Sequence, residues 1–134
     1  MRNSAMNESD VKRAMVKSMK DHNGYARRIE DQYAVGIMDM ILIPLGLPVF
    51  MAEVKVVSGN VFGPTVRQLM ELERIREVAF KAGHVIPVMI GCKNWTYYFH
   101  EPRQSIDCRE CFSVTSLKMS FHDQLVQYYH SRRK

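Results

Sequence analysis

This chain of 134 residues has little of what marks secreted or membrane proteins. It contains three cysteines, an odd number that is too small for a disulfide framework. No apolar run approaches the roughly 18 residues that a membrane-spanning helix requires. The first residues also lack the apolar core of a secretory signal. We therefore expect a cytoplasmic protein with no membrane contact.

The cysteines do not predict a metal site. Cys108 and Cys111 have the spacing of a zinc knuckle, but a structural zinc site needs four ligands. The missing ligands would have to be histidines brought there by the fold. We expect free thiols instead.

Acidic residues are the scarcer of the charged kinds, with 14 against 19 basic residues and a net charge of +5. A basic surface suits a polyanionic partner, of which nucleic acid is the commonest. At 46% hydrophobic and 25% charged, the composition is that of an ordinary globular protein. The length suits one domain, residues 1–134.

Hydrophobic periodicity predicts helices at both ends of the chain and in its middle, with strands between them. The first half is predicted to contain a helix from Glu8 to about Asp21, a strand within Tyr25–Val35, two strands within Met38–Val57 and a loop to Pro64. Asn7, Ser9 or Asp10 would cap the first helix, and Gly24 would end it. The second half is predicted to contain a helix from about Thr65 to Lys81, a buried strand over Val85–Gly91, a strand over Trp95–Phe99, a loop over Gln104–Thr115 and a helix over Phe121–Tyr129. Pro87 favours an edge strand or an irregular one.

The apolar hairpin in the middle of the chain carries three charges. Side chains alternate faces along a strand, so Glu53 and Lys55 project to the same side. In a hairpin centred on Gly46, Asp39 and Glu53 lie seven positions before and after the turn and face each other. Cross-strand Cβ atoms are roughly 4.5–5.5 Å apart, so the two carboxylates repel unless a cation lies between them.

Burying such charges is costly unless something pairs with them. Carboxylate oxygens favour Mg²⁺, with Mn²⁺ as a substitute. We therefore predict a divalent metal held by Asp39 and Glu53, with Lys55 beside a bound water, the layout of a site that cuts phosphodiesters. The alternative is a surface hairpin whose polar face happens to carry both acids.

The order of elements and charges resembles the PD-(D/E)xK nuclease superfamily, and within it the virus-type replication-repair nuclease domain (VRR-Nuc). The family pattern is a glutamate early in the first helix, Gly-x-Pro-Asp, Glu-x-Lys, a glutamine on the next helix and a glycine at its end. In this chain the matching residues are Glu8, Gly36-Ile37-Met38-Asp39 (with Met38 in place of the proline), Glu53-Val54-Lys55, Gln68 and Gly83. The family-like core spans about residues 8–100, and residues 101–134 form a C-terminal extension.

The resemblance implies an α/β fold with a central mixed sheet of about four to five strands flanked by helices, in the order α-β-β-β-α-β. It assigns metal binding to Asp39, Glu53 and the Val54 carbonyl, with Glu8 as a further candidate ligand. Lys55 would orient or help to deprotonate the attacking water. Gln68 would hydrogen-bond Lys55, that water or a phosphate.

The implied function is a metal-dependent DNA endonuclease acting on branched DNA, as a Holliday junction resolvase does, with no nucleotide cofactor. Such proteins are homodimers, and a twofold enzyme cuts a twofold junction symmetrically. A bacterial cytoplasm or a phage-infected host cell is implied as the setting. Four basic residues are candidate DNA contacts: Lys12, Lys17, Arg27 and Arg28.

Two alternatives remain open at this point. One is a restriction- or repair-type nuclease of the same superfamily with another DNA substrate. The other is a non-catalytic module that keeps the fold and binds DNA.

Overall fold

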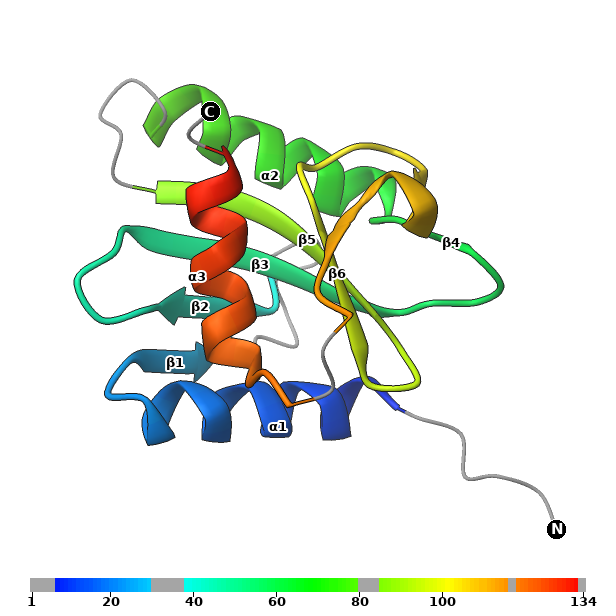
Figure 1. The fold of residues 1–134 in the computed structure, drawn as a ribbon. Coiled ribbons are helices and arrows are strands. Elements are labelled where there is room, and N and C mark those ends of the chain that lie inside the picture. The colour runs from blue at the N-terminus through cyan, green and yellow to red at the C-terminus, as the bar shows by residue number, and fades with distance from the viewer. Residues whose placement is uncertain (1–6, 30–37, 80–84, 116–117, 133–134) are drawn as a thin grey trace, which may run out of the picture.

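In the computed structural model, helices cover both faces of a mixed sheet (Figure 1). The structure describes residues 7–29, 38–79, 85–115 and 118–132. Its elements are α1 (Glu8–Asp21), β1 (Tyr25–Arg28), β2 (Met40–Ile43), β3 (Val49–Val56), β4 (Val61–Phe62), α2 (Val66–Ala79), β5 (Val85–Lys93), β6 (Thr96–His100), β7 (Ile106–Asp107), η2 (Cys108–Glu110), β8 (Phe112–Ser113) and α3 (Phe121–Arg132). No described helix is both long and apolar enough to cross a membrane.

Among the described residues, six strands form the main sheet, in the order β1-β2-β3-β5-β6-β8. The strands β3 and β5 are parallel and joined through α2, while the other neighbours are antiparallel. The predicted fold class is confirmed: a mixed α/β sheet flanked by helices in the expected order. The sheet exceeds the expected four to five strands because the short β8 pairs with β6.

The core lies in two apolar layers, one on each face of the sheet. On one face, α1 and α3 pack with the sheet around aromatic side chains such as Phe50 and Phe99. On the other face, Leu72 of α2 packs against Met89 of β5. The β5 residues from Ile86 to Cys92 are all buried, as expected for a central strand covered on both faces.

The predicted hairpin register is confirmed. Met40 pairs with Ala52, and Leu42 pairs with Phe50, so partners are equidistant from position 46. Gly46 adopts a φ of 77°, in the left-handed region that glycine enters at no steric cost. The turn therefore sets which residues of the two strands face each other.

The prediction that Pro87 marks an edge or irregular strand was wrong, because β5 lies inside the sheet between β3 and β6. Proline is tolerated because the β5–β6 ladder begins only at Met89. At Pro87 the strand pairs with β3 alone, opposite Met51. The missing N–H therefore costs no bond to β6.

The helix α1 begins and ends where predicted, with one change at its end. Asn7 caps the start, its side chain accepting a hydrogen bond from the Asp10 N–H. At the other end, Asn23 takes the left-handed conformation, with φ of 62°. Gly24 follows it and closes the helix by donating its N–H to the Met19 carbonyl.

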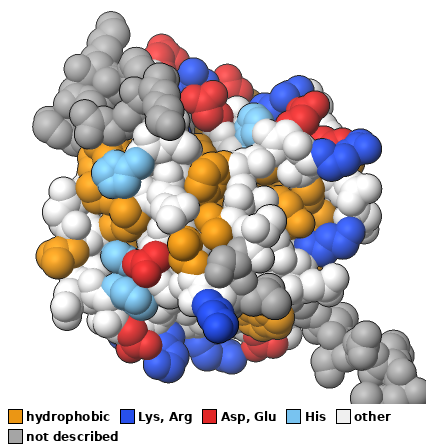
Figure 2. Space-filling model, viewed as in Figure 1, with side chains coloured by type: hydrophobic (Ala, Val, Ile, Leu, Met, Phe, Trp, Pro, Cys, Tyr) orange, Lys and Arg blue, Asp and Glu red, His pale blue; other side chains and the backbone are white. Residues whose placement is uncertain are grey.

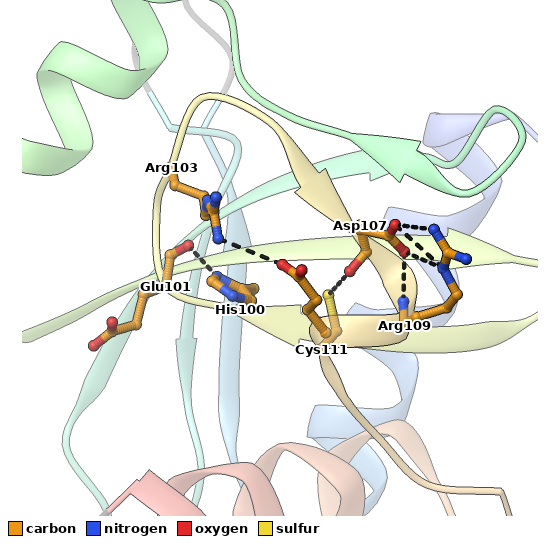
Figure 3. A network of polar contacts seen from close by, with 7 residues as sticks. His100, Glu101, Arg103, Asp107, Arg109 and Cys111 are labelled. Carbon is orange, nitrogen blue, oxygen red and sulfur yellow. Dashed lines mark hydrogen bonds and ion pairs between the residues drawn. The ribbon is translucent and has the colours of Figure 1, made fainter.

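Two predicted loops contain short strands. β4 lies within the expected loop before Pro64 and pairs with β7. Segment 104–115 contains β7, η2 and β8. Asp107 caps η2, and its carboxylate also forms an ion pair with the Arg109 side chain (Figure 3). Cys111 donates its thiol to the Asp107 carbonyl, and all three cysteines are free thiols, as predicted.

A polar cluster joins the end of α1 to the start of α3. The His22 and His122 rings stack 4.8 Å apart, within 9° of parallel. The Ser18 hydroxyl accepts a hydrogen bond from the His122 backbone N–H, and the Ser18 backbone carbonyl is hydrogen-bonded to His22 Nδ1. His22, His122 and Asp123 are close enough to be considered as metal ligands, but nearly parallel rings do not direct their nitrogens at one point. We interpret the cluster as structural.

The aromatic core predicts where the fold is most sensitive. Phe99 is 1% exposed and contacts Phe112, Phe121 and Tyr128. We expect Phe99→Ala to lower the free energy of unfolding by about 3–5 kcal/mol, because it leaves a cavity between sheet and α3. Urea denaturation of the metal-free protein measures this. Tyr25→Ala, at a half-exposed position, is the control, with about 0.5 kcal/mol expected.

Candidate active site

The backbone at the start of β2 holds Asp39 in place. The β2–β3 ladder begins at Met40, so no β2 strand residue faces Val54. The Val54 N–H donates instead to Asp39 Oδ2, over 2.9 Å. The Asp39 carbonyl accepts from the Ile29 N–H, which follows β1. Asp39 is thus held by hydrogen bonds from β3 and from the residue after β1, and it lies one position before the β2–β3 ladder begins.

Glu53 is the most buried charged side chain that the structure describes, with 1% exposed. Its Oε2 accepts a 2.6 Å hydrogen bond from the Gln68 amide, and the Lys55 ammonium lies 3.6 Å from the same oxygen. Burial, with the neighbouring Asp39 carboxyl as a second cause, raises the pKa of Glu53 to about 9. Ammonium groups of Lys55 and Lys12 offset part of this increase.

Gln68 reaches Glu53 because it also caps α2. The Thr65 N–H donates to Gln68 Oε1, and the Gln68 N–H donates to Thr65 Oγ1. This reciprocal pair is a capping box, T-x-x-Q, at the helix start. With its oxygen held by the cap, the amide presents its NH₂ group to Glu53.

Lys55 lies on the same side of β3 as Glu53, as alternation predicted. Its side chain is 21% exposed, against 1% for the Glu53 side chain. The pair therefore has a buried acid and a cation that reaches solvent. The structure brings together Asp39, Glu53, Lys55 and Gln68.

Lys12 was expected to contact DNA along the first helix; the structure places its ammonium within this cluster, and its contact with DNA stays a prediction. Its Nζ lies 3.0 Å from Asp39 Oδ1 and 4.0 Å from Glu8 Oε1. The side chain is only 14% exposed. A sequence signal existed: Lys12 follows Glu8 by one helical turn, so the two share a face of α1. If the resemblance places Glu8 near the metal site, the helix also places Lys12 there.

The other candidate DNA contacts lie outside this cluster. Lys17 pairs with Asp21, and both side chains are exposed. Side chains of both signs mix along the edge of the molecule that α1 forms (Figure 2). Arg27 is exposed on β1, and Arg28 donates a long hydrogen bond of 3.4 Å to Ser9. Their contact with DNA stays a prediction. The motif residues Gly36 and Ile37, and Gly83 at the expected end of the second helix, lie outside the described residues.

The residues present suit a divalent metal. Glu53 Oε1 is buried and has no hydrogen-bond partner among the described residues, an arrangement that is costly unless a ligand satisfies the oxygen. Asp39 supplies a second carboxylate beside it. In a strand, the N–H and C=O of one residue serve the same side, so we expect the Val54 carbonyl to face Asp39. Carboxylates and a carbonyl are the oxygen donors that Mg²⁺ and Mn²⁺ prefer.

Glu8 is not part of this pair. Among the described residues, Asp39, Glu53 and Glu8 do not form a group of three acids within mutual ligand distance. Glu8 contacts the site through Lys12 and is 44% exposed at its side chain. Its role as a metal ligand stays a prediction.

The raised Glu53 pKa predicts how stability depends on pH. Between pH 4.5, the ordinary pKa, and about 9, the folded metal-free protein holds a proton that the unfolded chain has released. The free energy of unfolding therefore falls as pH rises through this window. We expect Glu53→Gln to reduce this fall and to stabilise the metal-free protein at pH 8. Urea denaturation in EDTA from pH 5 to 9 measures both. Equal pH dependence in the two proteins would contradict the assignment.

Comparisons with known proteins support the fold alone. No family model matches the chain, and no curated protein matches it. Among solved structures, it is similar to Hjc, a Holliday junction resolvase from the archaeal hyperthermophile Archaeoglobus fulgidus, with a TM-score of 0.56. The likeness covers 79% of this chain and 90% of that one, at 14% sequence identity. This chain therefore shares the mixed α/β fold of that resolvase.

Proposed function

We propose that this protein is a divalent-metal-dependent endonuclease that hydrolyses DNA phosphodiester bonds. The observation that carries the proposal is the pairing of Asp39 with Glu53, whose carboxyl is buried and leaves one oxygen without a partner among the described residues. A surface hairpin, the alternative interpretation, would leave the Glu53 carboxylate in water. The fold shared with a Holliday junction resolvase supports the same conclusion.

Asp39, Glu53 and the Val54 carbonyl would hold the metal, with Mg²⁺ expected and Mn²⁺ as a substitute. When bound, such an ion lowers the pKa of a water and polarises a phosphoryl oxygen. Gln68 holds Glu53 Oε2 and so leaves Oε1 as the free ligand atom. This arrangement matches the PD-(D/E)xK pattern that the sequence resembles.

Lys55 would act on the substrate. Its ammonium is partly exposed next to Glu53, within reach of a phosphate placed beside the two acids. There it would orient the attacking water and stabilise the negative charge that develops on the phosphate oxygens. Lys55 thus acts directly on reacting groups, and Gln68 acts by positioning Glu53.

Branched DNA is the substrate that we infer, with a VRR-Nuc-like homodimer as the active form. The support is the fold of a Holliday junction resolvase, the motif order and a net charge of +5. A four-way junction has two equivalent strands to cut, and a twofold dimer offers two equivalent sites. A restriction- or repair-type nuclease would share the site and differ in substrate.

A cleavage panel tests the enzyme and its substrate together. With Mg²⁺, we expect the wild type to nick four-way junctions faster than linear, flapped or forked DNA of the same sequence. Asp39→Asn should lower the rate at least about a hundredfold, because it removes a charged ligand. Gel electrophoresis of end-labelled strands gives the rates.

The matched control is Asp21→Asn, which makes the same chemical change at the end of α1. The Asp21 side chain is 55% exposed and pairs with Lys17, away from the site, so this variant should cleave like the wild type. Cleavage of no substrate by the wild type would contradict the enzyme proposal. Junction binding without cleavage would favour a non-catalytic DNA-binding module. Equal rates on linear DNA would favour a restriction- or repair-type enzyme.

The dimer has a separate test. Size-exclusion chromatography with light scattering should give about twice the 15.6 kDa chain mass at micromolar concentration. A mass of one chain, with junction cleavage intact, would overturn the symmetric-dimer proposal and leave the nuclease proposal standing.

A further inference from the structure

Lys12 differs from the other basic residues of α1 in where its charge lies. Arg13 and Lys17 have side chains that are 71% and 77% exposed, and each pairs with an acid of the same helix. The Lys12 side chain is 14% exposed, and its ammonium crosses to Asp39 on a different element. Drawing an ammonium out of water requires a strong partner, and here the partner is a predicted metal ligand.

The hydrogen bonds of Asp39 show what Lys12 occupies. Oδ2 accepts the Val54 N–H at 2.9 Å, and Oδ1 lies 3.0 Å from the Lys12 ammonium. Oδ1 is therefore the oxygen left for a metal, and the ammonium already lies against it. Two cations on one carboxylate oxygen repel each other strongly in a partly buried site. The ammonium and a divalent ion thus compete for Asp39.

A second acceptor lies near the same ammonium. Glu8 Oε1 is 4.0 Å from Lys12 Nζ, one helical turn back, and the Glu8 side chain is 44% exposed. A small rotation of the long Lys12 side chain would bring the ammonium closer to Glu8 and away from Asp39. The move keeps the lysine paired throughout.

We propose that Lys12 is the counter-ion of Asp39 in the metal-free site, and that a divalent metal displaces its ammonium from Asp39 to Glu8. The inference rests on the proposed function, because it takes Asp39 and Glu53 as the metal ligands. Lys12 is then a positioning residue that holds Asp39 before the metal arrives. Glu8 serves Lys12 and is not itself a metal ligand.

Calorimetric titration of the DNA-free protein with Mg²⁺ and with Mn²⁺ tests the competition. Lys12→Gln should bind the metal about tenfold more tightly than the wild type, because the competing charge is gone. Lys20→Gln removes the same charge from an exposed position of α1 and is the matched control, with unchanged affinity expected. Unchanged or weaker metal binding by Lys12→Gln would overturn the proposal.

A double-mutant cycle decides the role of Glu8. If Glu8 receives the displaced ammonium, Glu8→Gln weakens metal binding in the wild type and has no effect in the Lys12→Gln background. If Glu8 is instead a metal ligand, it weakens binding in both backgrounds, and that part of the proposal is wrong.

Amine labelling of the wild type needs no variant. With acetic anhydride and mass spectrometry, we expect Lys12 to be protected in EDTA and to react severalfold faster at saturating Mg²⁺, while Lys20 reacts equally in both. Protection that persists with metal bound would contradict displacement.

Different results would overturn the role of Lys12 and the metal site itself. A wild type that binds metal and cleaves DNA, beside a Lys12→Gln variant of equal affinity, overturns the role of Lys12 alone. Absence of metal binding in both proteins overturns the metal site and the role of Lys12 together.

Discussion

The hydrogen bond from the Val54 N–H to the Asp39 carboxylate ties the hairpin to the site. The ladder between β2 and β3 begins at Met40, while β3 continues past Val54. A strand N–H without a strand partner must be satisfied by another acceptor, and here that acceptor is a carboxylate oxygen. The side chain of Asp39 thus takes the place of one more strand residue and is held beside Glu53.

The rest of the site is arranged around that pair by elements far apart in the sequence. The connection from β3 through α2 to β5 places the start of α2 over Glu53, and the capping box there turns Gln68 toward it. The α1 helix brings Lys12 to the other acid. One acid therefore meets an amide and the other meets an ammonium, so the two carboxylates have different surroundings. Burial raises the pKa of Glu53, so this carboxyl keeps its proton at neutral pH until a cation binds.

The arrangement carries a cost in stability. A buried glutamic acid with a raised pKa opposes folding at neutral pH, and its oxygen without a partner among the described residues adds to the penalty. Two apolar layers on the faces of the sheet supply the stability that offsets it. A costly group in an otherwise consistent core is a common mark of a functional site.

The sequence by itself determined the order of the longer helices and strands, the Gly46 turn and hence the β2–β3 register, because these follow from local periodicity and turn chemistry. It also placed Glu53 and Lys55 on one face, since alternation along a strand is geometric. Only the tertiary structure decided that Pro87 lies in an interior strand, that Gln68 reaches Glu53 and that Lys12 belongs to Asp39. These depend on how separate elements pack, and an amphipathic pattern does not say which charge of a helix faces solvent and which faces a neighbouring acid.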